Sequence, residues 1–262
     1  MNILVCIKQV ADDSVNVSLN SAGFPNLDGI AMVVNAFDTY ALEMAVRLKE
    51  SCGGIVTVLS LGNAGVRESL KNSLAVGGDR AFLICDSAFD NLDTQGIATV
   101  LCGAIRKLEQ DQGAEFDLIL FGKESTDYSS GQIGALVAEL LGRGLAVSVT
   151  ASEPGNGVLT LRKETEDGYC TLSAQLPAVI TVGRTLYEPR YATIKSKLAA
   201  RKAEIPVLSG ADFPGLEVPV SGETVMEMRE PAKRAAGQII KEETTEETVS
   251  QLLERLREAS VL

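Results

Sequence analysis

The chain has 262 residues, 45% of them hydrophobic, which suffices for one α/β core with a smaller addition or for two small domains. Its 35 acidic residues outnumber 24 basic ones, for a formal net charge of −11, and no basic run of the kind that binds nucleic-acid phosphates is present. The absence of histidine excludes Ser-His-Asp catalysis and histidine-based zinc sites, so we predict neither a catalytic residue nor a metal site.

The first half of the chain alternates between apolar runs and helical patterns. Residues 3–7 predict a strand buried on both faces, and the alternation at 15–19 predicts a short hairpin beside it. Asn35 is expected to cap a helix over 37–48, with Asp38 near the positive end of its dipole. Helical spacing predicts further helices over 66–74, 94–108 and 131–141.

Further strands are predicted between these helices, at 55–61, 81–85, 118–121, 145–150 and 178–182. Apolar strands that alternate with helices indicate a Rossmann-like α/β fold, a parallel sheet with helices on both faces. Two strands that flank a polar turn, at 158–161 and 170–174, predict an antiparallel addition to this sheet.

The character of the chain changes near Glu204, after which four of the eight prolines occur with little periodicity between them. We interpret this stretch as an extended arm that lies on a partner. A capping-box pattern, Thr244 with Glu247, starts a final helix whose apolar stripe packs either on the parent domain or on a partner. The expected division is a nucleotide-binding α/β domain over 1–204 and a C-terminal arm and helix over 205–262.

The cysteine content favours a reducing compartment. The five cysteines are odd in number and form no CxxC pair. The first apolar run ends at Lys8, and no run approaches the roughly 18 apolar residues of a membrane span. We therefore predict a cytoplasmic protein that does not insert into a membrane.

The segment 121–134 is the most informative one for function. It leaves the carboxyl end of a buried strand and enters a helix, and in open parallel sheets ligands bind at that edge. The N–H groups of a helix N-terminus suit a phosphate, and glycines at 122, 131 and 134 are expected to let the backbone approach an anion. The segment is neither a Walker A loop nor a GxGxxG fingerprint, and an ordinary strand–helix loop is the alternative interpretation.

Other strand ends and helix starts could face the same edge. They are Cys6 to Lys8, Asn35 to Asp38, and Leu61 with Gly62. Each alone is more often structural, but their shared position at strand ends favours a nucleotide pocket.

Several blocks in this order resemble the beta, or small, subunit of electron-transfer flavoproteins. The blocks are Val5-Cys-Ile-Lys-Gln-Val10, Asn35-Ala-Phe-Asp38 with the following 41–50, the segment 122–134, Glu188-Pro-Arg-Tyr-Ala-Thr-Ile194, and Arg234-Ala-Ala-Gly237. They run over nearly the whole chain. The resemblance implies an electron-carrying heterodimer with an alpha subunit that holds most of one FAD, and a second nucleotide held by this chain.

The resemblance also implies the positions that hold the second nucleotide. They are Cys6, Asn35, Ala36, Phe37, Asp38, Leu61, Gly122, Lys123, Glu124, Ser125, Thr126, Asp127, Tyr128, Ser129, Ser130, Gly131, Gln132 and Ile133. In one branch of the family the nucleotide is a structural AMP. In the bifurcating branch it is a second FAD, which takes hydride from NADH and sends electrons two ways. Ile133 stands where AMP-binding members can offer a threonine hydroxyl, and this favours FAD.

A docking segment for acyl-CoA dehydrogenase or another flavoprotein dehydrogenase is implied in the same way. It is expected to be a loop with Ile194 as its apolar anchor, made of Tyr191, Ala192, Thr193, Ile194, Lys195, Ser196, Lys197 and Leu198. Two other hypotheses stay open at this point. They are a stand-alone adenine-nucleotide-binding domain of the stress-protein type, and an ATP-using ligase or hydrolase.

Overall fold

The computed structural model describes residues 1–155, 157–232 and 236–262. The chain divides into two units: the larger holds Met1–Val17 with Pro25–Met226, and the smaller holds Ser18–Phe24 with Glu227–Leu262. The block at 234–237 lies partly outside the described residues.

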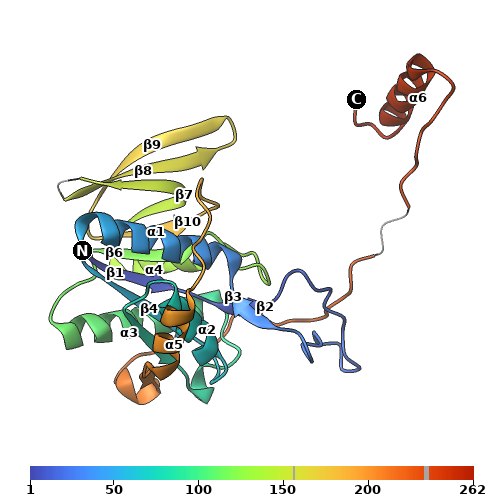
Figure 1. The fold of residues 1–262 in the computed structure, drawn as a ribbon. Helices are drawn as coiled ribbons and strands as arrows, with labels where there is room; N and C mark the ends of the chain where they lie inside the picture. The colour runs from blue at the N-terminus through green and yellow to red at the C-terminus, as the bar shows by residue number, and fades with distance from the viewer. Residues whose placement is uncertain (156, 233–235) are drawn as a thin grey trace. The chain divides into compact units, whose positions relative to one another are not determined.

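The larger unit is built on a nine-stranded sheet of order β11-β5-β4-β1-β6-β10-β7-β8-β9 (Figure 1). Its strands are β1 (Asn2–Cys6), β4 (Ile55–Leu61), β5 (Arg80–Ile84), β6 (Leu118–Gly122), β7 (Gly144–Pro154), β8 (Val158–Thr165), β9 (Gly168–Gln175), β10 (Ala178–Val182) and β11 (Val207–Leu208). Pairing is parallel from β11 through β7 and antiparallel from β7 to β9. The predicted parallel α/β sheet with an antiparallel addition is thus confirmed.

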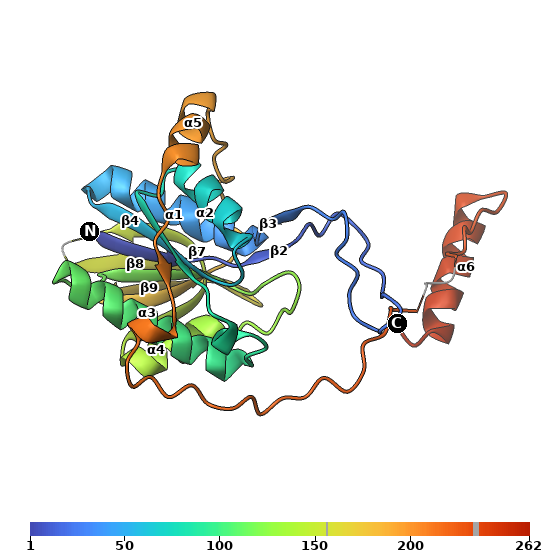
Figure 2. The ribbon, with the colours of Figure 1, turned by 90° about the horizontal axis from the view of Figure 1, so that it is seen from below.

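Helices cover both faces of this sheet. They are α1 (Ala36–Cys52), α2 (Val66–Ala75), α3 (Thr94–Gln112), α4 (Ile133–Leu141) and α5 (Ile194–Lys202), with short 3-10 turns at Ser87–Phe89 and Gly210–Asp212. Figure 2 shows α1 and α2 on one side of the sheet and α3 and α4 on the other.

The side chains of β1 alternate between the two faces of the sheet, so this short strand contributes to the core on both sides. Ile3 and Val5 join the core cluster of α1 and α2, whereas Leu4 and Cys6 join the cluster of α3 and α4. Because successive side chains of a strand point to opposite faces, a continuous apolar run can bury both. The last residue of β1, Cys6, therefore faces the layer of α3 and α4 at the carboxyl edge.

Three sequence expectations are corrected. The hairpin near β1 forms from β2 (Gln9–Ala11) and β3 (Met32–Val34) rather than around 15–19. The expected loop at 191–198 turns into helix α5 from Ile194 onward, with the Thr193 hydroxyl accepting the N–H of Ser196. The first part of the expected arm is also structured, because β11 pairs with β5 and its Leu208 is buried.

The smaller unit contains α6 (Thr245–Glu258), which begins with the predicted capping box of Thr244 and Glu247. Within this unit the Leu19 N–H donates to the Glu230 carboxylate at 3.1 Å.

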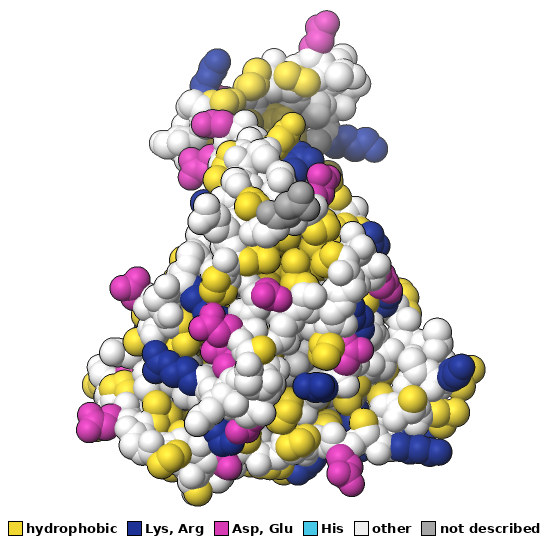
Figure 3. Space-filling view, turned by 90° about the vertical axis from the view of Figure 1, so that its left-hand side faces the viewer, with side chains coloured by type: hydrophobic (Ala, Val, Ile, Leu, Met, Phe, Trp, Pro, Cys, Tyr) yellow, Lys and Arg dark blue, Asp and Glu magenta, His cyan; other side chains and the backbone are white. Residues whose placement is uncertain are grey.

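Surface charge in the larger unit is mixed. Lys and Arg side chains are interspersed with Asp and Glu side chains on the face shown in Figure 3. Among the helices of the described residues, none combines the length and apolar character needed to cross a bilayer.

Candidate functional site: a cavity at the carboxyl edge of the sheet

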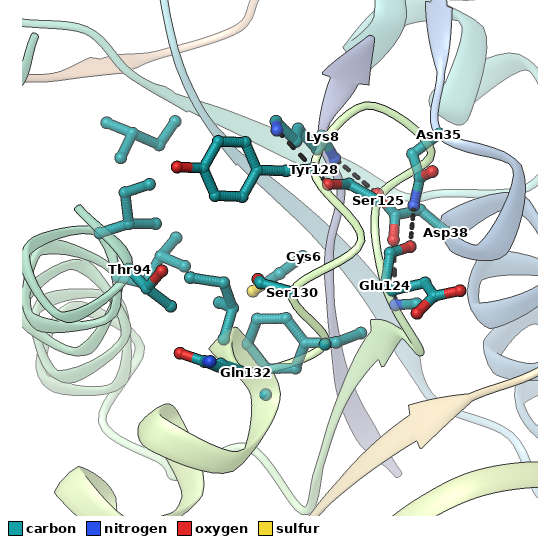
Figure 4. A pocket seen from close by; sticks show the side chains of 18 of the residues that line it. Cys6, Lys8, Asn35, Asp38, Thr94, Glu124, Ser125, Tyr128, Ser130 and Gln132 are labelled. Atoms are coloured by element: carbon teal, nitrogen blue, oxygen red, sulfur yellow. Dashed lines mark hydrogen bonds between the residues drawn. The ribbon is translucent and has the colours of Figure 1, made fainter. Parts of the chain in front are cut away.

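A cavity of about 340 Å³ opens where β1, β4 and β6 end. Its floor is Cys6 and Leu61, one wall is the loop after β6 with the start of α4, and the opposite wall is the start of α3. Figure 4 shows Thr94 on α3 facing Ser130 and Gln132 across the cavity, with apolar side chains between them. The lining is Cys6, Ile7, Lys8, Asn35, Asp38, Leu61, Leu92, Asp93, Thr94, Ile97, Leu101, Phe121, Gly122, Lys123, Glu124, Ser125, Tyr128, Ser130, Gly131, Gln132, Ile133, Gly134 and Glu223.

Asp38, in the first turn of α1, joins the ends of two strands. Its Oδ2 accepts the N–H of Lys8 at 2.6 Å, and its Oδ1 accepts the N–H of Gly122 at 2.9 Å. Burial raises the pKa of the Asp38 carboxyl to about 7, although the hydrogen bonds from Lys8, Asn35 and Gly122 act in the opposite direction. Both oxygens are engaged, so this carboxyl is a structural clamp behind the cavity.

Asn35 shapes the loop that follows β6. The residue occupies the N-cap position of α1, as predicted, but its side chain bonds to the loop instead of capping the helix. Its Nδ2 donates to the Glu124 carbonyl at 2.8 Å, and its Oδ1 accepts the Thr126 N–H at 3.0 Å. One amide thus fixes the backbone on both sides of Ser125.

Lys8 supplies a positive charge at the rim of the cavity. Its Nζ lies 2.7 Å from Oδ1 of Asp127 and 3.5 Å from Oγ of Ser125. The same ammonium lies 6.0 Å from the centroid of the Tyr128 ring. These contacts hold the lysine over the loop.

The start of α4 offers the helix N–H groups expected of an anion site. Gln132 occupies its N-cap position, and within the described structure no side chain caps this helix. The first N–H groups of a helix have no partner within the helix and carry partial positive charge. An anion at this wall would therefore meet free donors.

Two of the glycines of the loop are required by the packing of the protein itself. A Cβ on Gly122 would clash with Oδ1 of Asp38, and one on Gly134 would lie 2.5 Å from Cγ2 of Thr181. Both glycines are required by packing against protein atoms. Gly131 has φ +64°, a left-handed conformation that favours glycine and turns the chain toward α4.

The thiol of Cys6 is inert in this setting. It is buried, and desolvation followed by the negative charge of Asp38 raises its pKa well above the usual value. The thiol therefore contributes an apolar surface to the floor of the cavity.

The structure brings most of the predicted nucleotide-binding residues to the cavity. Five of the predicted positions do not line it: Ala36, Phe37, Thr126, Asp127 and Ser129. Phe37 packs beside Gly122, Thr126 and Asp127 bond to Asn35 and Lys8, and the Ser129 hydroxyl donates to the Ser125 carbonyl at 3.2 Å. These residues support the wall rather than form it.

Sequence reasoning missed the wall formed by the start of α3. Leu92, Ile97 and Leu101 give it an apolar surface, and Asp93 caps the helix through the Gly96 N–H at 2.8 Å. This segment also follows a strand and opens a helix, so the rule that located the other segments could have found it.

The predicted docking segment 191–198 is exposed in its first half. Tyr191 and Ile194 are 94% and 82% exposed. Just before it, the Arg190 guanidinium donates to Glu43 at 2.8 Å and to Glu50 at 2.6 Å, both on α1. The segment is thus anchored to the helix whose other end carries Asn35.

A parallel α/β sheet with a cavity at the carboxyl ends of its strands defines the class of doubly wound α/β folds, whose ligands bind at that edge. The sequence profile described as "Electron transfer flavoprotein domain" matches residues 27–213. The chain belongs to the electron transfer flavoprotein family, among its beta subunits.

Relatives match over nearly their whole length. The electron transfer flavoprotein subunit beta of Megasphaera elsdenii is 34% identical, with 98% of both chains covered. That of Thermoanaerobacterium thermosaccharolyticum is 33% identical with both chains fully covered. The caffeyl-CoA reductase-Etf complex subunit CarD of Acetobacterium woodii is 28% identical, also over the full length of both.

Proposed function

We propose that this chain is the beta subunit of a heterodimeric electron-transfer flavoprotein and that its cavity holds an adenine nucleotide. The observation that carries the proposal is the cavity at the carboxyl edge, with uncapped N–H groups at the start of α4 and apolar residues from α3. Its volume and its mixture of apolar walls with few polar groups suit a small ligand. The free donors suit the phosphate and the apolar wall suits a flat ring.

We propose further that the nucleotide is FAD rather than AMP. Ile133 at the start of α4 and Leu92, Ile97 and Leu101 opposite it give the cavity two apolar walls. Such residues fit a flavin ring, and FAD held here would supply the electron-accepting chemistry while the chain binds and orients it. Two flavins per heterodimer would permit bifurcation of electrons from NADH. CarD, by its name, belongs to a complex of this kind of flavoprotein with a reductase.

The proposed partners are an alpha subunit and an acyl-CoA dehydrogenase or other flavoprotein dehydrogenase, and the proposed location is the cytoplasm. The exposed Tyr191 and Ile194 support a docking role for the segment 191–198. All five cysteines are free thiols, in keeping with a reducing compartment.

Cofactor extraction tests these proposals in one measurement. The chain is co-expressed with its alpha subunit, the complex is purified, and the nucleotides released by acid are quantified by chromatography. We expect two FAD per heterodimer. One FAD with one AMP would retain the nucleotide site but contradict a second flavin, and one FAD with no second nucleotide would contradict the site itself.

A further inference from the structure

The chain returns to the cavity after β11, along a path that follows α3. Leu216 and Val218 pack against the core cluster of α3 and α4, and a Cβ on Gly103 of α3 would lie 2.9 Å from Cδ2 of Leu216. The residues that follow reach the start of α3, and Glu223 lines the cavity. This stretch lies beyond residue 213, where the family match ends.

The Asp93 carboxylate at the start of α3 holds the chain next to Glu223 in place. Asp93 accepts the Gly96 N–H with Oδ1 and the Gly222 N–H with Oδ2, each at 2.8 Å. These two backbone hydrogen bonds lower the pKa of the Asp93 carboxyl, which therefore stays ionised. Glu223 follows directly after the tethered Gly222.

The two walls of the cavity differ in electrostatics. The start of α4 is uncapped within the described residues and lies with Lys8 at the rim, so it attracts a phosphate. The start of α3 is already occupied by the Asp93 carboxylate, and Glu223 adds a second negative charge there. A nucleotide whose phosphate lies at α4 would present its ribose toward α3. A carboxylate can accept hydrogen bonds from two neighbouring hydroxyls, which is how acidic residues recognise ribose in dinucleotide-binding folds.

We propose that Glu223 binds the ribose hydroxyls of the nucleotide and that Asp93 is the residue that positions it through Gly222. The inference rests on the proposed nucleotide-binding function. It assigns a specificity role to the chain after β11, because a ribose with free hydroxyls is favoured there and a 2′-phosphate is repelled.

The contact is tested by removing each of its two partners in turn: the 2′-hydroxyl from the ligand and the carboxylate from Glu223. The complex of the full-length chain with its alpha subunit is stripped of nucleotide, and Kd values for AMP and 2′-deoxy-AMP are measured by calorimetry. We expect the wild type to bind AMP at least about tenfold more tightly than 2′-deoxy-AMP, since hydrogen bonds to a charged group are stronger than those between neutral groups. Glu223→Ala is expected to bring the ratio close to 1. Glu217→Ala, an exposed residue of the same stretch, is the matched control and should keep the wild-type ratio.

A second variant isolates the positioning role. Asp93→Ser keeps a good helix N-cap for α3 but loses the second oxygen that accepts the Gly222 N–H. We expect the AMP to 2′-deoxy-AMP ratio to fall at least threefold while the melting temperature changes little. An unchanged ratio would contradict the proposal that Asp93 positions Glu223 through the Gly222 N–H.

Failure of the proposed function and failure of this inference give different results. A wild-type complex that binds neither AMP nor FAD in the cavity of this chain contradicts both. A complex that binds AMP with a ratio unaffected by Glu223→Ala overturns the ribose contact and leaves the nucleotide site standing.

Discussion

At the scale of single residues, Asp38 holds together the ends of β1 and β6. Asp38→Ala would leave the N–H groups of Lys8 and Gly122 without their acceptor. Each buried donor left unpaired costs about 1–3 kcal/mol, so we expect the free energy of unfolding to fall by about 2–6 kcal/mol. Denaturant unfolding measures this loss. The control is Asp127→Ala, which removes an exposed ion pair and should cost less than about 1 kcal/mol.

The same carboxyl should make stability depend on pH. Its pKa is raised by burial from 3.8 when unfolded to about 7 in the folded chain, so the folded state binds the proton more tightly. Its contribution to stability is therefore full below about pH 4, decreases as the pH rises to 7, and is constant above that. Relative to Asp38→Asn, the wild type should lose up to about 1.4 kcal/mol per pH unit in this window. Parallel curves for the two proteins between pH 5 and 7 would contradict this prediction.

A substitution of Asn35 should affect nucleotide binding in the cavity more than the stability of the fold. Asn35→Asp keeps an acceptor for the Thr126 N–H but replaces the donor to the Glu124 carbonyl with a repelling oxygen. We expect the loop to lose its shape and the bound nucleotide to be held about tenfold more weakly, a loss of about 1.4 kcal/mol. Nucleotide retention after gel filtration measures the change. Thr39→Val, which removes an exposed hydroxyl bond within α1, should retain the nucleotide.

Residue-scale predictions from sequence succeed where the chemistry is local. The Thr244 and Glu247 capping box was predictable because its partners are three residues apart. Asn35 was predicted to be a helix cap for the same local reason, but its partners belong to the loop 89 and 91 residues further on. The residues near Asn35 in the sequence give no indication that its side chain contacts that loop.

At the scale of elements, the expected strands and helices formed where an apolar pattern ran long enough. α5 was missed because Ala200 is its one buried residue among those described, so it lacks an apolar stripe. β11 spans two residues and exists only because β5 offers it an edge. The α3 wall of the cavity was missed as a site, although its helix was predicted, because Leu92, Ile97 and Leu101 also serve as core residues.

The anchor of the docking segment gives an element-scale prediction. Arg190 pairs with Glu43, which is almost fully buried, and with Glu50. Burial opposes the ionisation of Glu43, but hydrogen bonds from Arg190 and Arg47 outweigh it and hold the pKa of Glu43 below its usual value. Arg190→Lys retains the charge but loses the planar fork, so we expect a loss of about 1–2 kcal/mol in unfolding free energy. Electron transfer to the proposed dehydrogenase partner should also slow as 191–198 loosens.

The matched control for this variant is Arg184→Lys. Arg184 makes an exposed pair with Glu188 at 3.4 Å, and such pairs contribute little. We expect its stability and its electron-transfer rate to stay at the wild-type level. Equal effects of the two lysine variants would contradict a special role for Arg190.

At the scale of the whole molecule, the position at which the larger unit ends determines which C-terminal truncations leave its core intact. The sheet continues past residue 204: Leu83 and Cys85 donate to the carbonyls of Pro206 and Leu208, and Asp86 accepts the Gly210 N–H. Phe213 is buried in the core beside α3. A chain that ends after Pro206 should therefore lose several kcal/mol of core stability, since removing one large buried side chain costs about 2–5 kcal/mol.

A chain that ends after Met226 should instead keep the larger unit and its proposed nucleotide site while losing α6. The apolar residues Val249, Leu252 and Leu253 on α6 are 39–48% exposed, a surface that a partner subunit would cover. We expect this truncated chain to unfold cooperatively at the wild-type melting temperature but to fail to co-elute with the alpha subunit in gel filtration. A full-length Leu252→Asp and Leu253→Asp double variant should fail in the same way, because charged residues are depleted from the core of stable interfaces. If both proteins still form the heterodimer with undiminished affinity, the alpha subunit is held by the larger unit alone and α6 has no part in assembly.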